Sequence, residues 1–130
     1  MKYIRTCEGK IINVEDTIKR FKNNQHLSDI ECDIVKAIIT EDTDSDGYKR
    51  RAIKEADTIE ELLNEIVAFK EKENGNYDWG ILSAKDYQAG LKYEIDEYVS
   101  KGYSAYGAIW TEKGLIYVAK MNEKGEWELV

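Results

Sequence analysis

Three short apolar runs near the C-terminus are separated by two turns that share the tripeptide Glu-Lys-Gly. The runs lie at residues 106–111, 115–121 and 126–129, and Gly114 and Gly125 end the two turns. Glycine supplies the positive φ that tight hairpin turns require. The pattern therefore predicts an antiparallel three-strand meander, which constrains the fold more than any other segment of the chain.

Two further segments have the pattern of amphipathic helices. Thr58 and Glu61 match a capping box, and apolar residues at helical spacing follow, which predicts a helix over about 59–69. Ser83 can cap a second and longer helix over about 84–100. Both helices have one apolar stripe and one charged face, so we expect both to pack on the sheet.

Residues 27–40 fit both a helix and a strand. Ser28 and Glu31 match a capping box, but the β-branched end of the segment runs into an acidic turn. We favour a β-hairpin formed by about 34–40 and 48–55, and the helical alternative stays open.

The remaining patterns complete an α+β fold class. Segments 2–6 and 10–14 predict an N-terminal hairpin or two edge strands. Residues 15–24 predict a helix, and 77–82 predict a strand. The predicted architecture is an antiparallel sheet that includes the C-terminal meander, with the two main helices packed on it. The chain of 130 residues has no linker or low-complexity tract, so we predict a single domain over residues 1–130.

The net charge of −7 disfavours direct binding to nucleic acid or to anionic membranes, because both are polyanions. No apolar run reaches the length of a membrane span, and no secretory signal stands at the N-terminus. We therefore expect a soluble cytoplasmic protein. Cys7 and Cys32 are too few to predict a disulfide scaffold or a zinc site.

None of the catalytic and metal-binding motifs GxSxG, HExxH, P-loop and CxxC appears in the sequence. His26 is the single histidine and lies among polar residues, so a cysteine nucleophile would have few candidates for its general base. We predict a protein without enzymatic activity and without a bound cofactor or metal.

The densest charge in the chain is acidic and lies between residues 29 and 46, where seven acids stand against one base. Carboxylates displayed along one edge can imitate phosphate spacing and meet the basic groove of a nucleic-acid-binding protein. The alternative is that the charge protects an edge strand from aggregation. The predicted partner-binding residues are Asp29, Glu31, Asp33, Glu41, Asp42, Asp44 and Asp46.

Part of this segment also matches the first half of a calcium-binding loop. Asp42, Asp44 and Asp46 alternate before a glycine, but Ile53 occupies the position where a bidentate glutamate is expected. The basic run 49–51 would repel a cation and is expected to form an internal ion pair with the opposite strand of the hairpin. A solvated acidic turn is the favoured interpretation, and calcium binding stays an alternative.

Aromatic residues offer a second candidate surface. The chain has nine tyrosines and three tryptophans, and Tyr77, Trp79, Tyr103 and Tyr106 flank predicted loops. Tyrosine and tryptophan are favoured at protein interfaces because they bury a large area with little loss of entropy. Packing in the core or at the sheet edge is the alternative for these residues.

The chain resembles a group of small proteins from phages and prophages of low-GC Gram-positive bacteria. The resemblance covers the segments Met1–Cys7 and Ala56–Leu63 and the meander. The resemblance implies an α+β fold and a phage accessory role in the bacterial cytoplasm, and it implies no site residue. By analogy with anti-CRISPR proteins, it suggests a non-catalytic acidic inhibitor of a host nucleic-acid-handling defence enzyme, acting by occlusion or nucleic-acid mimicry. The alternative is a structural or assembly module that forms homo-oligomers, such as a homodimer, through a sheet edge and without a host target.

Overall fold

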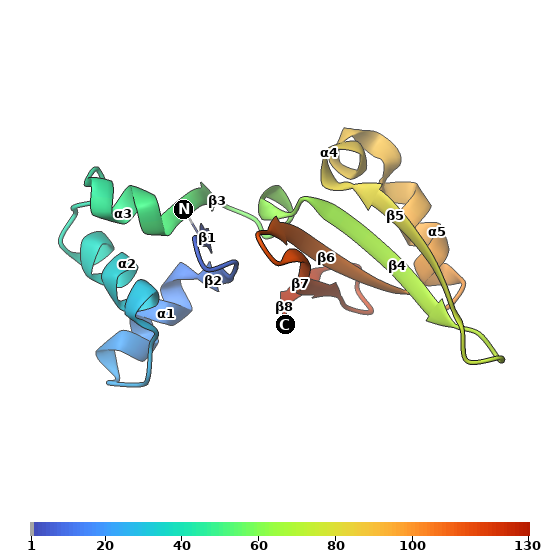
Figure 1. Ribbon diagram of the computed structural model, residues 1–130, viewed down its shortest axis with the longest axis horizontal. Coiled ribbons are helices and arrows are strands. Elements are labelled where there is room, and N and C mark those ends of the chain that lie inside the picture. Colours follow the sequence, from blue (N-terminus) through green and yellow to red (C-terminus); the bar gives the residue numbers. More distant parts are fainter. Residues whose placement is uncertain (1) are drawn as a thin grey trace. The chain divides into compact units, whose positions relative to one another are not determined.

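The computed structural model describes residues 2–130, which form helices and antiparallel strands (Figure 1). The α+β class predicted from the sequence is confirmed. The chain divides into two units, Met1–Thr58 and Ile59–Val130, which we call the N-terminal and C-terminal units. That the whole chain behaves as one domain stays a prediction, which a single thermal unfolding transition would support.

The N-terminal unit has a small antiparallel sheet in the order β2-β1-β3. The predicted hairpin and the predicted helix over 15–24 are confirmed. Buried side chains from the sheet and the helices, among them Ile4, Ile34 and Tyr48, form its core. Its elements are β1 (Tyr3–Thr6), β2 (Ile11–Asn13), α1 (Val14–Lys22), α2 (Asp29–Ile39), α3 (Asp46–Arg51) and β3 (Ala52–Ala56).

The predicted hairpin of 34–40 and 48–55 is wrong, and the helical alternative is correct. The capping box forms at α2, because Ser28 Oγ accepts a hydrogen bond from the Glu31 amide and the Glu31 carboxylate accepts one from the Ser28 amide. Ile34 and its neighbour Val35 then fall on the buried face of the helix. The second segment does end in a strand, β3, but this strand pairs with β1.

The C-terminal unit is built on an antiparallel sheet in the order β5-β4-β6-β7-β8, and its last three strands are the predicted meander. The strand expected at 77–82 is also confirmed. The elements are a 3-10 turn η1 (Glu60–Leu62), β4 (Glu65–Glu71), β5 (Tyr77–Ser83), α4 (Ala84–Asp86), a π-helical turn η2 (Tyr87–Leu91), α5 (Lys92–Ser100), β6 (Ser104–Thr111), β7 (Gly114–Met121) and β8 (Trp127–Leu129).

The helix predicted over 59–69 is wrong, because helical structure stops after the single turn η1. The apolar run Ile66–Phe69 lies in β4, which pairs with β5 on one side and β6 on the other. Ile66 and Val67 point to opposite faces and both are buried. Such a continuous apolar run is compatible with a central strand of a sheet and with a helix. Here the segment is a strand, because it pairs with a neighbouring strand on each side.

The helix predicted over 84–100 is present but broken. Gly90 has a φ of +118°, which ends one helical segment before α5 begins. The α4–α5 segment covers one face of the sheet, where Ile95 of α5 is 1% exposed. A Cβ added at Gly80 would lie 2.8 Å from Tyr98 Oη, so the helix and β5 approach closely at this glycine. None of the helices between residues 2 and 130 has the length and apolar character that a membrane crossing needs.

Candidate functional site

One face of the five-stranded sheet is lined by large apolar side chains that no helix of the C-terminal unit covers. Side chains alternate between the two faces along each strand, so the register of β4 and β5 places Ile81 beside Val67 and Trp79 beside Phe69 on this face. We call this surface the aromatic face and define it by Val67, Phe69, Tyr77, Trp79, Ile81, Tyr106, Leu115 and Tyr117.

Four rings of the aromatic face pack against one another, those of Phe69, Tyr77, Tyr106 and Tyr117. Phe69 stacks on Tyr106 with 5.2 Å between ring centroids, and Tyr106 stacks on Tyr117 at 5.1 Å. Tyr77 meets Phe69 edge to face at 5.8 Å, and the Lys120 ammonium lies 5.5 Å from the Tyr106 ring centroid. Such pairs add stability beyond the area that they bury, so the surface is ordered before any partner arrives.

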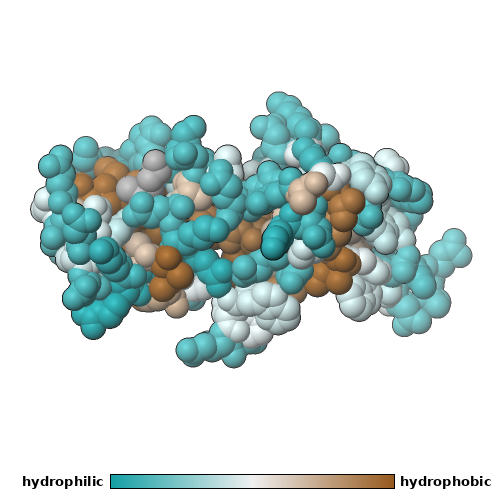
Figure 2. Space-filling view, turned by 90° about the horizontal axis from the view of Figure 1, so that it is seen from above, coloured by the Kyte–Doolittle hydropathy of each residue, from teal (hydrophilic) through white to brown (hydrophobic). Residues whose placement is uncertain are grey.

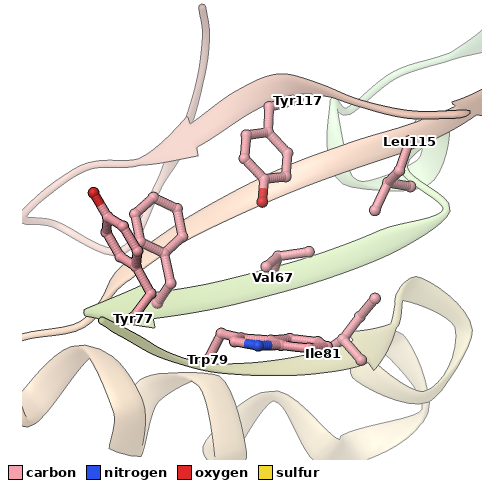
Figure 3. Close-up of a pocket in the computed structure, with 7 residues that line it drawn as sticks. Val67, Tyr77, Trp79, Ile81, Leu115 and Tyr117 are labelled. Atoms are coloured by element: carbon pink, nitrogen blue, oxygen red, sulfur yellow. The ribbon is translucent and has the colours of Figure 1, made fainter. Parts of the chain in front are cut away.

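An open groove of about 580 Å³ runs along the aromatic face and is lined by rings of this face (Figure 3). In the close-up, Trp79 and Ile81 lie side by side along β5, and Val67 forms the floor between them and Tyr117. Trp79 is 64% exposed and Tyr77 is 58% exposed. Contiguous apolar surface of this kind marks binding sites on soluble proteins. The residues that line the groove are Val67, Phe69, Tyr77, Trp79, Ile81, Leu115 and Tyr117.

The opposite face of the same sheet contrasts with the aromatic face. Ile66 and Ala68 of β4 point toward the helical side and are both fully buried. The core of the unit is therefore complete without Trp79 or Tyr77. In the space-filling view, brown apolar side chains also reach the surface of this unit on the right of the picture (Figure 2). Core packing on the helical side therefore does not account for the exposed rings of Tyr77 and Trp79.

The rim of the aromatic face is acidic. Glu65, Glu71 and Glu128 share this face by register, against the single ammonium of Lys120. Glu65 also accepts a hydrogen bond from Trp110 Nε1 at 3.3 Å. Residues 59–130 carry fourteen acidic and eight basic residues, which gives the C-terminal unit a net charge of −6. The groove thus combines an apolar floor with a negative surround.

The acidic segment predicted as a partner surface lies in the N-terminal unit, and the structure separates its members. Glu31 is 7% exposed and is used internally, since its carboxylate accepts hydrogen bonds from the Ser28 amide and from Arg20 Nη2 at 3.0 Å. Burial raises the pKa of Glu31, but the Ser28 and Arg20 hydrogen bonds outweigh burial and hold it below its usual value. The expectation that Glu31 is displayed outward is therefore corrected.

The remaining acids fall into separate groups. Asp33 is paired with Arg51 Nε at 2.9 Å. The basic run therefore does form an ion pair, but its partner lies on helix α2 and not on an opposite strand. Asp29 lies in the first turn of α2, and the loop acids follow its last turn, so the length of an eleven-residue helix, about 16 Å, lies between them. The last four acids follow one another along the chain after α2 and are all exposed: Glu41, Asp42, Asp44 and Asp46. A partner-binding role for these four stays a prediction.

The described residues around these surfaces were compared with the side-chain groups that bind metal ions or perform catalysis. Within residues 2–130, no group of three or more His, Cys, Asp or Glu side chains is arranged to hold a metal ion, the loop aspartates included. Cys7 is an exposed free thiol, Cys32 is a half-buried one, and His26 is exposed. The arrangement can bind a partner through apolar contact and charge.

The sequence did point to part of the aromatic face. Tyr77, Trp79 and Tyr106 were candidates for an interface, and the alternation of apolar and polar residues from Tyr77 to Ile81 is the signal that puts three of the face's side chains on one side of a strand. Phe69 and Tyr117 were missed, because their positions depend on pairing between distant segments. Comparisons with protein-family models, curated protein sequences and solved structures gave no match.

Proposed function

We propose that this chain is a non-catalytic protein-binding module and that the aromatic face is its binding surface. The observation that carries the proposal is the exposure of Trp79, at 64%, on a sheet whose other face is already fully packed. Ordered aromatic side chains around a groove are typical of the few residues that dominate binding energy at protein interfaces.

The occupant that fits best is a basic protein surface that presents apolar side chains. Apolar groups of the partner would fill the groove, and its lysines or arginines would meet the carboxylates of Glu65, Glu71 and Glu128. The net charge of the unit disfavours nucleic acid itself as the ligand.

Within this proposal, the class of partner suggested by the phage resemblance is a host nucleic-acid-handling defence enzyme. Such enzymes have basic grooves, and a module of this charge would act by stoichiometric occlusion of the groove. The interface would then be the aromatic face. Cytoplasmic location in a bacterial host belongs to the same proposal.

The test begins with capture of the partner from the bacterial host on the tagged chain, followed by titration of the purified partner against variants. Trp79→Ala is expected to weaken binding about 30-fold, the effect of losing one central aromatic anchor of about 2 kcal/mol. Tyr93→Ala is the matched control, because Tyr93 is 60% exposed on α5 and lies outside the aromatic face. It should leave the affinity unchanged.

A third variant separates the two candidate surfaces. Asp42→Asn combined with Asp44→Asn removes charge from the loop and leaves the groove intact. If this variant loses binding while Trp79→Ala retains it, the acidic segment is the interface and the proposal is wrong. Equal loss in Trp79→Ala and Tyr93→Ala would also refute it, because the aromatic face would then have no special role.

A further inference from the structure

The outer edge of β5 is open. β5 is the first strand of the five-stranded sheet and pairs only with β4. Within residues 2–130, the backbone of Tyr77–Ser83 makes no further backbone hydrogen bond outside regular elements. The strand is seven residues long and contains no Pro, Lys or Arg, the residues that usually protect an exposed edge from pairing. β8, the other edge, has only three residues.

The hydrogen-bonding pattern identifies which backbone groups face this edge. Lys72 N donates to Asn76 O at 2.7 Å, and Ala84 N donates to Asn64 O at 2.9 Å, so the even-numbered residues of β5 form the hydrogen-bonded pairs with β4. Hydrogen-bonded and non-hydrogen-bonded pairs alternate in an antiparallel ladder. The N–H and C=O groups of Tyr77, Trp79 and Ile81 therefore point outward.

We infer that two copies of this chain associate through β5, antiparallel and centred on Gly80, to form one continuous sheet. In this register Trp79 lies opposite Ile81 of the second copy, and their outward backbone groups form hydrogen bonds in both directions. Tyr77 lies opposite Ser83, and Asp78 opposite Leu82. The register uses the full length of β5 and follows the symmetry of a two-fold interface.

Side-chain chemistry favours this self-pairing. An aromatic residue opposite a β-branched one is a stabilising cross-strand pair, and Trp79 with Ile81 occurs twice across the two-fold axis. No like charges stand directly opposite. The one charged residue of β5, Asp78, accepts a hydrogen bond from Tyr103 Oη on its own chain. The two aromatic faces then lie on the same side of the joined sheet, so each groove, which is open at Trp79 and Ile81, is extended by the second copy.

The surface area that two copies can bury at β5 determines the expected affinity of the dimer. Tyr77, Trp79 and Ile81 are 58%, 64% and 49% exposed. With roughly 150–250 Å² for a large side chain, the three offer about 300 Å² per copy, less than the roughly 800 Å² per partner of a stable complex. We therefore expect a weak dimer whose population depends on concentration. Because each copy has a net charge of −7, added salt should strengthen the dimer. Binding of the basic partner proposed above should instead weaken with salt.

Sedimentation or light scattering over a concentration series tests the inference. The wild-type mass should rise from 15.0 kDa toward twice that value. Trp79→Lys combined with Ile81→Lys places like charges opposite each other and should raise the dissociation constant about tenfold or more. Trp79→Lys combined with Ile81→Glu places opposite charges in the same positions and should restore association. Tyr93→Lys is the control for an added charge away from the edge.

A mutation-free measurement accompanies these variants in case one of them fails to fold. In wild type, hydrogen exchange at the Trp79 and Ile81 amides should slow as the concentration rises. The Gly80 and Leu82 amides face β4 and should be protected throughout. A wild-type chain that stays monomeric at sub-millimolar concentration overturns the inference. The β5 register is overturned if the like-charge variant dimerises as strongly as wild type. It is also overturned if the opposite-charge variant does not restore dimerisation. Each of these results leaves the aromatic face available as a monomeric binding surface.

Discussion

Replacing Glu31 tests whether the carboxylate supports the fold or serves a partner. Glu31→Ala leaves the Ser28 amide without its acceptor and Arg20 without its closest carboxylate, which lies 3.0 Å from Nη2. Loss of a helix-capping interaction costs about 1 kcal/mol. Loss of a hydrogen bond to a charged group costs about 1.5–3 kcal/mol, and the lower end applies because the Arg20 side chain is 35% exposed. The expected destabilisation is about 2–3 kcal/mol.

Urea unfolding followed by circular dichroism measures this change. Glu31→Gln keeps an acceptor for the Ser28 amide and removes only the charge, so it should cost about 1 kcal/mol. Asp44→Ala is the control, because Asp44 is exposed and a typical surface substitution changes stability by less than about 0.5 kcal/mol. If Glu31→Ala is no more harmful than Asp44→Ala, the internal role of Glu31 is refuted.

The same residue predicts a pH dependence. The pKa of Glu31 in the folded chain lies below the ordinary value of 4.5, so the ionised carboxylate stabilises the folded state. This contribution is fully present above pH 4.5 and is lost as the pH falls through the lowered pKa of the folded state. The difference in unfolding free energy between wild type and Glu31→Gln should therefore shrink in acid. A constant difference down to strongly acidic pH would contradict the assignment.

Further substitutions probe the C-terminal unit by thermal and urea unfolding. Gly107→Ala places a Cβ 2.5 Å from the Leu63 side chain and should lower the free energy of unfolding by about 1–3 kcal/mol. The loss should be smaller when the substitution is made in a Leu63→Ala background. If the two losses add strictly, the two residues are not in contact. Gly90→Ala should lower the free energy of unfolding by about 1–2 kcal/mol, because the φ of Gly90 is +118°. Unchanged stability would contradict the break in the helix at this residue. Trp79→Ala should change stability by less than about 0.5 kcal/mol, whereas the buried Ile66→Ala should cost about 2–5 kcal/mol. A large effect at Trp79 would make it a core residue.

Local chemistry made the meander and the N-terminal hairpin predictable. Gly114 and Gly125 both have positive φ in the structure, as the turns required. The two failures arose where local patterns were compatible with more than one element. The apolar run of β4 has no alternation to distinguish a buried strand from a helix, and its state depends on β5 and β6, which come later in the chain. For α2, the β-branched end favoured a strand, but the capping box and the buried face at Ile34 prevailed.

The candidate site was only partly accessible from the sequence. Counting acids located the densest charge but not its partners, because the ion pairs of Glu31 with Arg20 and of Asp33 with Arg51 join segments that are separate in the chain. The aromatic face needs four strands in register, and a residue such as Tyr117 acquires its role only through pairing of β6 with β7. Residue type identified candidates here, and sheet topology selected among them.

Amide chemical-shift mapping with the captured partner tests the central claim most directly. Shift changes should centre on β4, β5 and β7 around Val67, Trp79 and Tyr117, with little change in the loop at Asp42–Asp46. Shift changes confined to that loop, or to the exposed side of α5 around Tyr93, would contradict it.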